Sequence, residues 1–295
     1  MMVGSFVTRM AEPLVLNDVT ALRSQLARWR AKRETVALVP TMGALHDGHI
    51  SLGRIAQTRA HHVVYTIFVN PTQFAPTEDL SAYPRTFEAD RAKLAALGAD
   101  AIFAPTPDIM YPPGFATTIS LSGPAVAGLE DRFRPTHFAG VATVVAKLLI
   151  QAMPDLAIFG EKDFQQLAVI RQLVRDLDLP ITIAGGPTLR EADGLAMSSR
   201  NVYLSADERA SAPLLQRVLS EAAAAIAAGE EPDSVLTYGR ERIVQGGFAL
   251  DYLEWRDAIS LGTASRQKPS RLLVAAKIGR TRLIDNVGVP AGGQP

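Results

Sequence analysis

The chain has 295 residues, 47% of them apolar, and its 30 basic and 30 acidic side chains cancel. This length and apolar content predict one large folded domain or two unequal ones and argue against disorder. The balanced charge argues against nucleic acid as a partner, and the absence of cysteine excludes disulfides, thiolate catalysis and Cys-ligated metals.

Apolar residues recur at helical spacing in the first patterned segment, 17–33, and a short apolar run typical of a buried strand follows at 35–39. The same alternation continues along the chain. Further strands are predicted at 62–69, 100–104, 155–159 and 181–184, and further helices at 50–59, 86–97, 141–151 and 164–177. Apolar strands that alternate with helices predict an α/β fold, a Rossmann-like doubly wound parallel sheet covered on both faces.

The pattern changes after Gly186, which predicts a Rossmann-like domain at 1–186 and a smaller C-terminal α+β domain at 187–295. Residues 205–208 have the form of a capping box and predict the start of a long alanine-rich helix. Segments 248–256 and 272–284 alternate like two strands, and loops are predicted at 229–232 and 262–270.

No membrane segment is expected. The longest apolar stretch, 138–150, is interrupted by Lys147 and is too short to span a bilayer. The start of the chain also lacks the pattern of a secretion signal, so we expect a cytoplasmic protein.

A glycine-containing loop follows the strand at 35–39. Its residues are Met42, Gly43, Ala44, Leu45, His46, Asp47, Gly48 and His49. Gly43 and Gly48 have the spacing of a P-loop, but His49-Ile50 stands where that motif requires Lys-Ser/Thr. Glycine allows close approach of a ligand, and the next helix begins near Gly48. We therefore predict an anion at this helix N-terminus, with both imidazoles as hydrogen-bond donors to phosphate oxygens.

Two alternatives stay open for His46 and His49, namely a metal pair and ordinary surface histidines. The H-x-x-H spacing lacks both the i, i+4 separation and the glutamate of H-E-x-x-H zinc sites. We therefore predict no metal site formed by the protein.

Two further polar segments have compositions suited to a nucleotide. Gly160, Glu161, Lys162 and Asp163 follow a predicted strand and could hold a phosphate and a ribose, although Asp163 could instead be only a helix N-cap. The run 197–200 places two hydroxyls beside a guanidinium, which suits a pyrophosphate leaving group; a serine-rich turn is the alternative.

The amides of 70–73 follow another predicted strand. They could orient a polar substrate or simply cap a loop. His61, His62, Glu88 and Asp90 are interpreted as structural, the two acids because they suit the first turn of a helix. The charged stretch 130–137 has no interpretation from spacing alone.

Taken in this order, the segments resemble the pantothenate synthetase family, within the wider HIGH-type nucleotidyltransferase superfamily. The similar blocks are 40–49, 68–74, 83–86, 137–148, 159–163, 190–203 and 283–286. The resemblance implies an AMP-forming ligase of pantothenate biosynthesis, in the coenzyme A pathway. Such a ligase joins (R)-pantoate to β-alanine through a pantoyl adenylate, consuming ATP and releasing AMP and pyrophosphate.

The resemblance also implies roles for individual residues. His49 would be the proton donor and His46 a second phosphate donor, while Lys162, Ser198, Ser199 and Arg200 would hold the β- and γ-phosphates. The nucleotide would further contact the rest of the 42–49 loop, Gly160, Glu161, Asp163, Leu189 and Met197. Gln73 and Gln166 would hold pantoate.

Four broader expectations follow from the resemblance. Mg²⁺ would accompany the triphosphate, two copies would form a homodimer, and the stretch 130–137 would help to close the site. Asp47, where the family often has Glu, would face solvent.

Two other functions are alternatives to ligation. One is an adenylyltransferase that stops at the nucleotidyl product. The other is a catalytically silent nucleotide- or RNA-binding module, against which the neutral charge and the complete set of polar residues argue.

Overall fold

The computed structural model describes residues 12–74, 80 and 83–290. Its larger sheet has six parallel strands in the order β1-β4-β3-β2-β5-β6. The strands are β1 (Leu14–Leu16), β2 (Val36–Thr41), β3 (His62–Ile67), β4 (Ala101–Phe103), β5 (Leu156–Gly160) and β6 (Thr182–Gly186). The predicted doubly wound parallel sheet is therefore confirmed; the short edge strand β1 was not predicted.

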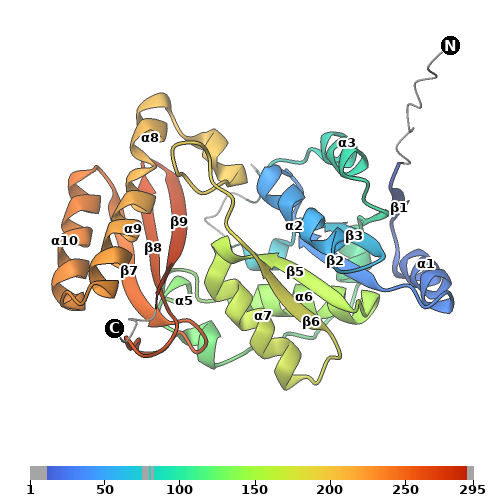
Figure 1. Ribbon diagram of the computed structural model, residues 1–295. Helices are drawn as coiled ribbons and strands as arrows, with labels where there is room; N and C mark the ends of the chain where they lie inside the picture. Colours follow the sequence, from blue (N-terminus) through green and yellow to red (C-terminus); the bar gives the residue numbers. More distant parts are fainter. Residues whose placement is uncertain (1–11, 75–79, 81–82, 291–295) are drawn as a thin grey trace, which may run out of the picture.

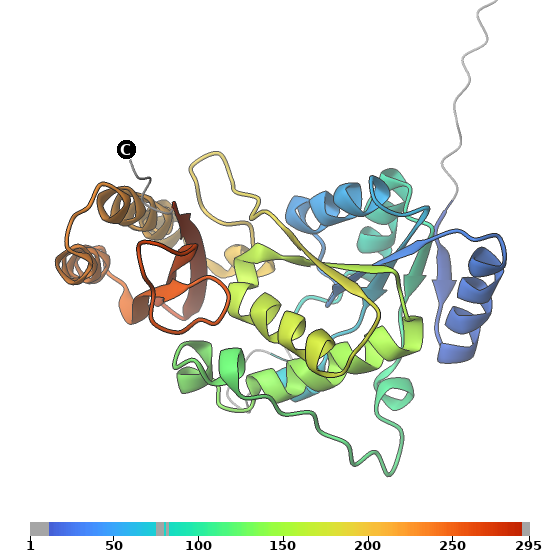
Figure 2. The ribbon, with the colours of Figure 1, turned by 60° about the horizontal axis from the view of Figure 1, so that its bottom comes forward.

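Helices cover both faces of this sheet because neighbouring residues of each strand point to opposite sides. In β2, Val36 and Leu38 belong to one apolar cluster, and Ala37 and Val39 belong to another. The first cluster includes side chains of α1 (Val19–Ala31), α6 (His137–Ala152) and α7 (Phe164–Asp176). The second includes side chains of α2 (Asp47–Gln57) and α3 (Phe87–Leu97). Figures 1 and 2 show these two helical layers on either side of the strands.

Short helical turns lie in the connections of the larger sheet. They are η1 (Pro71–Gln73), α4 (Pro107–Met110), η2 (Gly123–Val126), α5 (Glu130–Phe133) and η3 (Glu161–Asp163). Both η1 and η3 lie just beyond the carboxyl ends of parallel strands, where ligands of such sheets bind.

The C-terminal part is built on an antiparallel sheet in the order β7-β8-β9. Its elements are η4 (Ser199–Tyr203), α8 (Ala206–Ser211), α9 (Leu214–Ala227), α10 (Pro232–Gln245), β7 (Ala249–Asp257), β8 (Ser270–Ile278) and β9 (Thr281–Val289). Helices α9 and α10 pack on its outer face. Its other face contacts the larger domain, where Phe164 of α7 clusters with Tyr252 and Leu273.

Three predictions for this part are wrong in detail. The capping box at Ser205 is present, but the helix it opens ends at Ser211, and Pro213, which cannot donate an interior helix hydrogen bond, precedes a separate α9. The single strand predicted at 272–284 is a hairpin that turns at Gly279, whose φ is +53°. The predicted loop at 229–232 is present up to residue 231, but helix α10, which begins at Pro232, was not predicted.

Among the described residues, no helix has both the length and the apolar character that a bilayer crossing requires.

Candidate functional site

The loop between β2 and α2 is held in an uncommon backbone conformation. Gly43 and Ala44 have φ values of +82° and +49°. Asp90 of α3, only 1% exposed, accepts the N–H groups of Ala44 at 2.9 Å and Leu45 at 2.8 Å. Lys93 donates to the carbonyl of Leu45. The loop is therefore fixed by a buried carboxylate from a distant helix, and Asp90 does more than favour the dipole of its own helix.

His46 and His49 cap the helix that follows. Nδ1 of His46 accepts the N–H of Gly48 at 3.2 Å, and Nδ1 of His49 accepts the N–H of His46 at 3.3 Å. A Cβ on Gly48 would lie 2.8 Å from Cε1 of His46, so the ring packs against bare backbone. Because both Nδ1 atoms accept, each neutral ring carries its proton on Nε2.

Burial keeps both imidazoles neutral. It lowers the pKa of His46 to about 4, with smaller contributions from Lys162 and Lys93. Burial, followed by the neighbouring His46, lowers the pKa of His49 to about 3. Each ring thus has one N–H to donate while the site holds no anion, and the negative charge of a bound phosphate would favour further protonation.

The turn η3 supplies the opposing cation. Asn286 of β9 donates from Nδ2 to the carbonyls of Glu161 at 2.9 Å and Lys162 at 2.8 Å. Lys162 Nζ lies 3.9 Å from the Asp163 carboxylate. Asp163 is at the N-cap position of α7, as the alternative expected, but its side chain makes no capping hydrogen bond. A residue of the second sheet therefore fixes the turn that carries Lys162.

The segment that follows β6 is also fastened to the second sheet. Arg190 makes a bidentate ion pair with Asp285 of β9, at 2.6 and 3.0 Å. The N–H of Met197 then donates to the carbonyl of Leu189 at 3.0 Å, closing the loop that precedes the hydroxyls. Ser198 Oγ accepts the N–H of Arg200 at 3.2 Å. These bonds place the predicted phosphate segment opposite the histidine loop.

Gln73 belongs to a buried amide network at the end of β3. Asn70, 1% exposed, donates to Gln73 Oε1 at 3.1 Å, while Gln73 Nε2 lies 3.0 Å from Met42 Sδ. The carbonyl of Gln73 accepts from Arg134 at 3.2 Å and lies 3.0 Å from Nδ1 of His137. The amides at 70–73 therefore do more than cap a loop.

These elements enclose a cavity of about 210 Å³, which we call the nucleotide cleft. Most predicted site residues line it: Met42, His46, Gly48, His49, Gln73, Gly160, Lys162, Asp163, Gln166, Leu189, Met197, Ser198, Ser199 and Arg200. Part of the remaining lining is apolar and includes Phe68, Val141, Val144 and Phe159. One cleft thus brings together imidazole, lysine, serine and arginine side chains, amides and an apolar surface.

Five predicted residues are not among those that line the cleft. Leu45 is 2% exposed and packs in the core, and Asp47 faces solvent as expected. Glu161 instead pairs with Arg271 at 3.3 Å. Gly43 and Ala44 shape the loop through their backbone.

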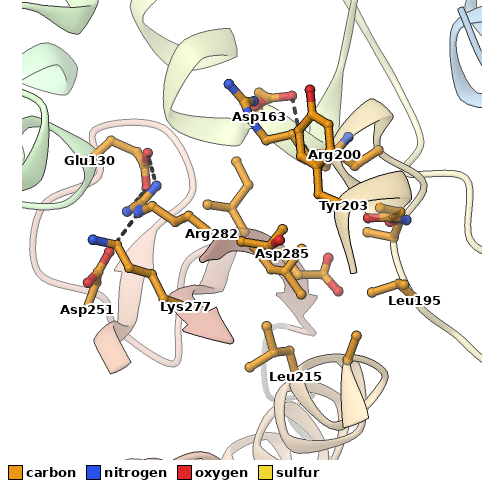
Figure 3. Close-up of a pocket in the computed structure, with 18 of the residues that line it drawn as sticks. Glu130, Asp163, Leu195, Arg200, Tyr203, Leu215, Asp251, Lys277, Arg282 and Asp285 are labelled. Carbon is orange, nitrogen blue, oxygen red and sulfur yellow. Dashed lines mark hydrogen bonds and ion pairs between the residues drawn. The ribbon is translucent and has the colours of Figure 1, made fainter. Parts of the chain in front are cut away.

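A second cavity of about 520 Å³ adjoins the cleft, and we call it the interdomain cavity (Figure 3). The two share Arg134, Lys162, Asp163, Ser198 and Arg200 as lining residues. Other walls come from Lys277, Arg280 and residues of β9.

Glu130 of α5 forms hydrogen bonds and an ion pair with residues of the antiparallel sheet beside this cavity. Its carboxylate accepts from Arg282 at 2.6 and 2.8 Å and from the Tyr252 hydroxyl at 2.8 Å. Burial opposes its charge, but the bonds and charge of Arg282 prevail and hold the pKa of Glu130 below its usual value.

Three residues at the site were given no individual chemical role from the sequence: Asp90, Tyr83 and Arg134. Tyr83, 5% exposed, lies with its hydroxyl 3.5 Å from Ser199 Oγ. In the sequence, Tyr83 was indicated only by its place in the segment 83–86, which resembles the family. Among the described residues, no group of three or more His, Asp or Glu side chains is arranged to hold a metal ion.

Comparison with known proteins gives consistent results. A family model described as pantoate-beta-alanine ligase matches residues 14–288. Pantothenate synthetases of Bradyrhizobium sp. and Rhodopseudomonas palustris are 60% and 58% identical over 279 residues, covering 94% of this chain and 99% of each relative.

Solved structures agree. Pantothenate synthetase from Thermus thermophilus has a TM-score of 0.87 and 44% identity, covering 94% of this chain and 99% of that one. A Francisella tularensis pantoate-beta-alanine ligase, described as complexed with beta-gamma ATP and beta-alanine, has a TM-score of 0.79 and 34% identity, covering 93% and 97%.

Proposed function

The chain belongs to the pantoate–β-alanine ligase family, and from this premise we propose which residues carry out its reaction. The enzyme condenses (R)-pantoate with β-alanine to give pantothenate. It consumes ATP, passes through a pantoyl adenylate and releases AMP and pyrophosphate. The observation that carries the assignment of residues is the pair of neutral imidazoles that share one cleft with Lys162 and the 198–200 segment.

In the first step a pantoate oxygen bonds to the α-phosphorus while the bond from that phosphorus to the bridging oxygen breaks. The electron pair leaves with pyrophosphate. Such a transfer needs positioning and charge stabilisation and no protein nucleophile. Nε2–H of His46 and His49 would donate to the phosphates, and Lys162, Ser198, Ser199 and Arg200 would hold the β- and γ-phosphates. Loss of one such donor costs about 3 kcal/mol of transition-state stabilisation.

Pantoate would lie at the other end of the cleft. Gln73 and Gln166 offer amides to its hydroxyl and carboxylate groups, and neither brings a charge that would compete with the nucleophile. The apolar surface around Phe68 and Val141 suits the two methyl groups that pantoate carries on one carbon. Gly160, Asp163, Met42, Leu189 and Met197 would contact the nucleoside.

In the second step the amine of β-alanine attacks the carbonyl carbon of the adenylate, and AMP leaves. Water must be excluded, because it would hydrolyse the mixed anhydride. The stretch 130–137 would contribute to closure. Support comes from two of its residues, since Glu130 pairs with Arg282 of β9 and Arg134 donates to the carbonyl of Gln73.

Three further proposals concern cofactor, assembly and location. Mg²⁺ would be held mainly by triphosphate oxygens and water, since the described residues offer no cluster of carboxylates or imidazoles for it. It would neutralise charge on the phosphates. The enzyme would act as a homodimer in the cytoplasm; light scattering of the purified protein tests the dimer.

AMP release from ATP and pantoate, with and without β-alanine, tests the function. We expect steady-state turnover only when both substrates are present. Full turnover that ignores β-alanine would favour an adenylyltransferase and contradict the assignment.

A single substitution tests the histidine loop. His49→Ala should fold normally and lose most turnover. His61→Ala is the matched control, because His61 hydrogen-bonds Thr35 away from the cleft and its loss should leave turnover unchanged. An active His49→Ala enzyme would reduce the loop to a structural role.

A further inference from the structure

The interdomain cavity has no assigned occupant. It adjoins the nucleotide cleft along Lys162, Ser198 and Arg200, which are the residues proposed to hold the β- and γ-phosphates. Gln73 and Gln166, at the pantoate end, line the cleft but not this cavity. The cavity therefore adjoins the residues proposed to hold the β- and γ-phosphates and does not reach the two glutamines proposed to hold pantoate.

Most acids of this cavity already take part in ion pairs. Arg282 pairs with Glu130 and Asp251, and Asp285 pairs with Arg190 outside the cavity lining. In Figure 3, Glu130, Arg282, Asp251 and Lys277 lie together on one side of the cavity. The acids that remain do not outweigh the cations.

Two exposed basic side chains of the β8–β9 hairpin take part in none of these ion pairs. Lys277 and Arg280 line the cavity, and within the described part of the chain neither forms an ion pair or side-chain hydrogen bond. In Figure 3, Lys277 and Arg200 lie on opposite sides of the cavity. Six basic and four acidic side chains line the cavity, so the hairpin adds to an excess of positive charge beside the residues proposed to hold the phosphates.

A polar atom without a partner adds a second observation. Thr281 lines the cavity, is 3% exposed, and its hydroxyl has no hydrogen-bond partner among the described residues. Buried hydroxyls usually find a partner. A ligand oxygen or an ordered water in this cavity would supply one.

The side on which the leaving group departs indicates which ligand this cavity would bind. In an in-line displacement the leaving group departs on the side opposite the nucleophile. Pantoate occupies the amide end, so pyrophosphate departs toward Lys162 and Arg200, whereas β-alanine must approach the carbonyl at the pantoate end. We propose that the interdomain cavity receives the leaving pyrophosphate, and that Lys277 and Arg280 bind it after it separates from the adenylate.

This inference rests on the proposed function, and ATP–pyrophosphate exchange separates the two. The assay follows labelled inorganic pyrophosphate into ATP with pantoate present and β-alanine absent. It yields a KM for pyrophosphate and a KM for ATP independently. Without pantoate-dependent exchange in the unaltered enzyme, the proposed function itself fails.

The test variant is Lys277→Gln/Arg280→Gln. Because two charge-assisted contacts are lost, we expect the KM for pyrophosphate to rise roughly tenfold. That rise should be at least about five times the rise in the KM for ATP, since the cations act on the separated product.

The matched control is Lys268→Gln/Arg217→Gln. It removes the same charge from the same domain, at positions that do not line the cavity, and should alter neither KM. A parallel rise in both KM values would assign Lys277 and Arg280 to the bound triphosphate and overturn the proposal. Unchanged values, or an equal effect in the control, would also overturn it. Thermal unfolding confirms that each variant folds.

Discussion

The buried carboxylate of Asp90 gives the sharpest test of how the histidine loop is held. It accepts two backbone N–H groups, from Ala44 and Leu45, and the hydroxyl of Thr86 at 3.2 Å. The substitution Asp90→Asn keeps the shape of the side chain and one oxygen. It replaces the other acceptor with an NH₂ group that faces an N–H donor.

The expected cost follows from these contacts. A hydrogen bond to a charged group contributes about 1.5–3 kcal/mol, and the variant loses one and weakens another. We therefore expect the free energy of unfolding to fall by about 2–3 kcal/mol. Ala44, at a φ of +49°, stores strain that the carboxylate offsets. The loop should relax, and the displaced imidazoles should lower kcat/KM for ATP about 100-fold.

Urea unfolding and steady-state AMP release measure the two effects. Glu88→Gln is the control, since Glu88 lies in the same helical turn with a side chain that is 81% exposed. It should change the free energy of unfolding by less than about 0.5 kcal/mol. An Asp90→Asn protein that matches this control in either the free energy of unfolding or kcat/KM for ATP would show that Asp90 does not hold the loop.

Three other outcomes are expected. Gly140→Ala places a Cβ 2.4 Å from the Thr72 carbonyl oxygen. This overpacking should lower the free energy of unfolding by about 1–3 kcal/mol and raise the KM for pantoate. Urea unfolding and steady-state kinetics measure the two effects. Below the ordinary histidine pKa of 6.5, His46 or His49 takes up a proton more readily when unfolded than when folded. The free energy of unfolding should therefore fall by up to about 1 kcal/mol per histidine between about pH 6.5 and about pH 5.5. Urea unfolding at several pH values measures this fall, which the His46→Asn/His49→Asn protein should lack. Glu130→Gln weakens a buried bidentate ion pair and should lower the free energy of unfolding by about 3 kcal/mol. An unfolding curve like that of the unaltered protein would show that the contact between Glu130 and Arg282 does not stabilise the fold.

Local patterns were sufficient for five of the six strands of the larger sheet and for the loops that carry the residues proposed to bind phosphate. The strand–loop–helix order around Gly48 predicted a helix N-terminus beside two imidazoles, and the structure has both. The tautomers were not predictable, because they depend on Nδ1 atoms that accept specific backbone N–H groups.

Features that depend on distant residues were missed. Asp90 has an ordinary local explanation as an acid in the first turn of a helix, and its partners lie 45 and 46 positions earlier. Arg282 and Glu130 are 152 positions apart. The break between α8 and α9 was predictable in principle, since Pro213 signals it. The β8–β9 hairpin was not predicted, because apolar residues alternate in the same way on both sides of Gly279.

The two anchors supplied by β9 have a consequence for protein engineering. Asp285 fastens Arg190, and Asn286 fastens the turn that carries Lys162, so the last strand of the chain sets the geometry of segments more than 90 positions earlier. A chimera that joins the first 186 residues to the C-terminal part of a relative would recombine the contact between Asn286 and this turn across the junction. Because Asn286 donates to main-chain carbonyls, which any residue supplies, the contact depends on the side chain that the C-terminal parent brings. We expect such hybrids to work only when that parent has asparagine at this position.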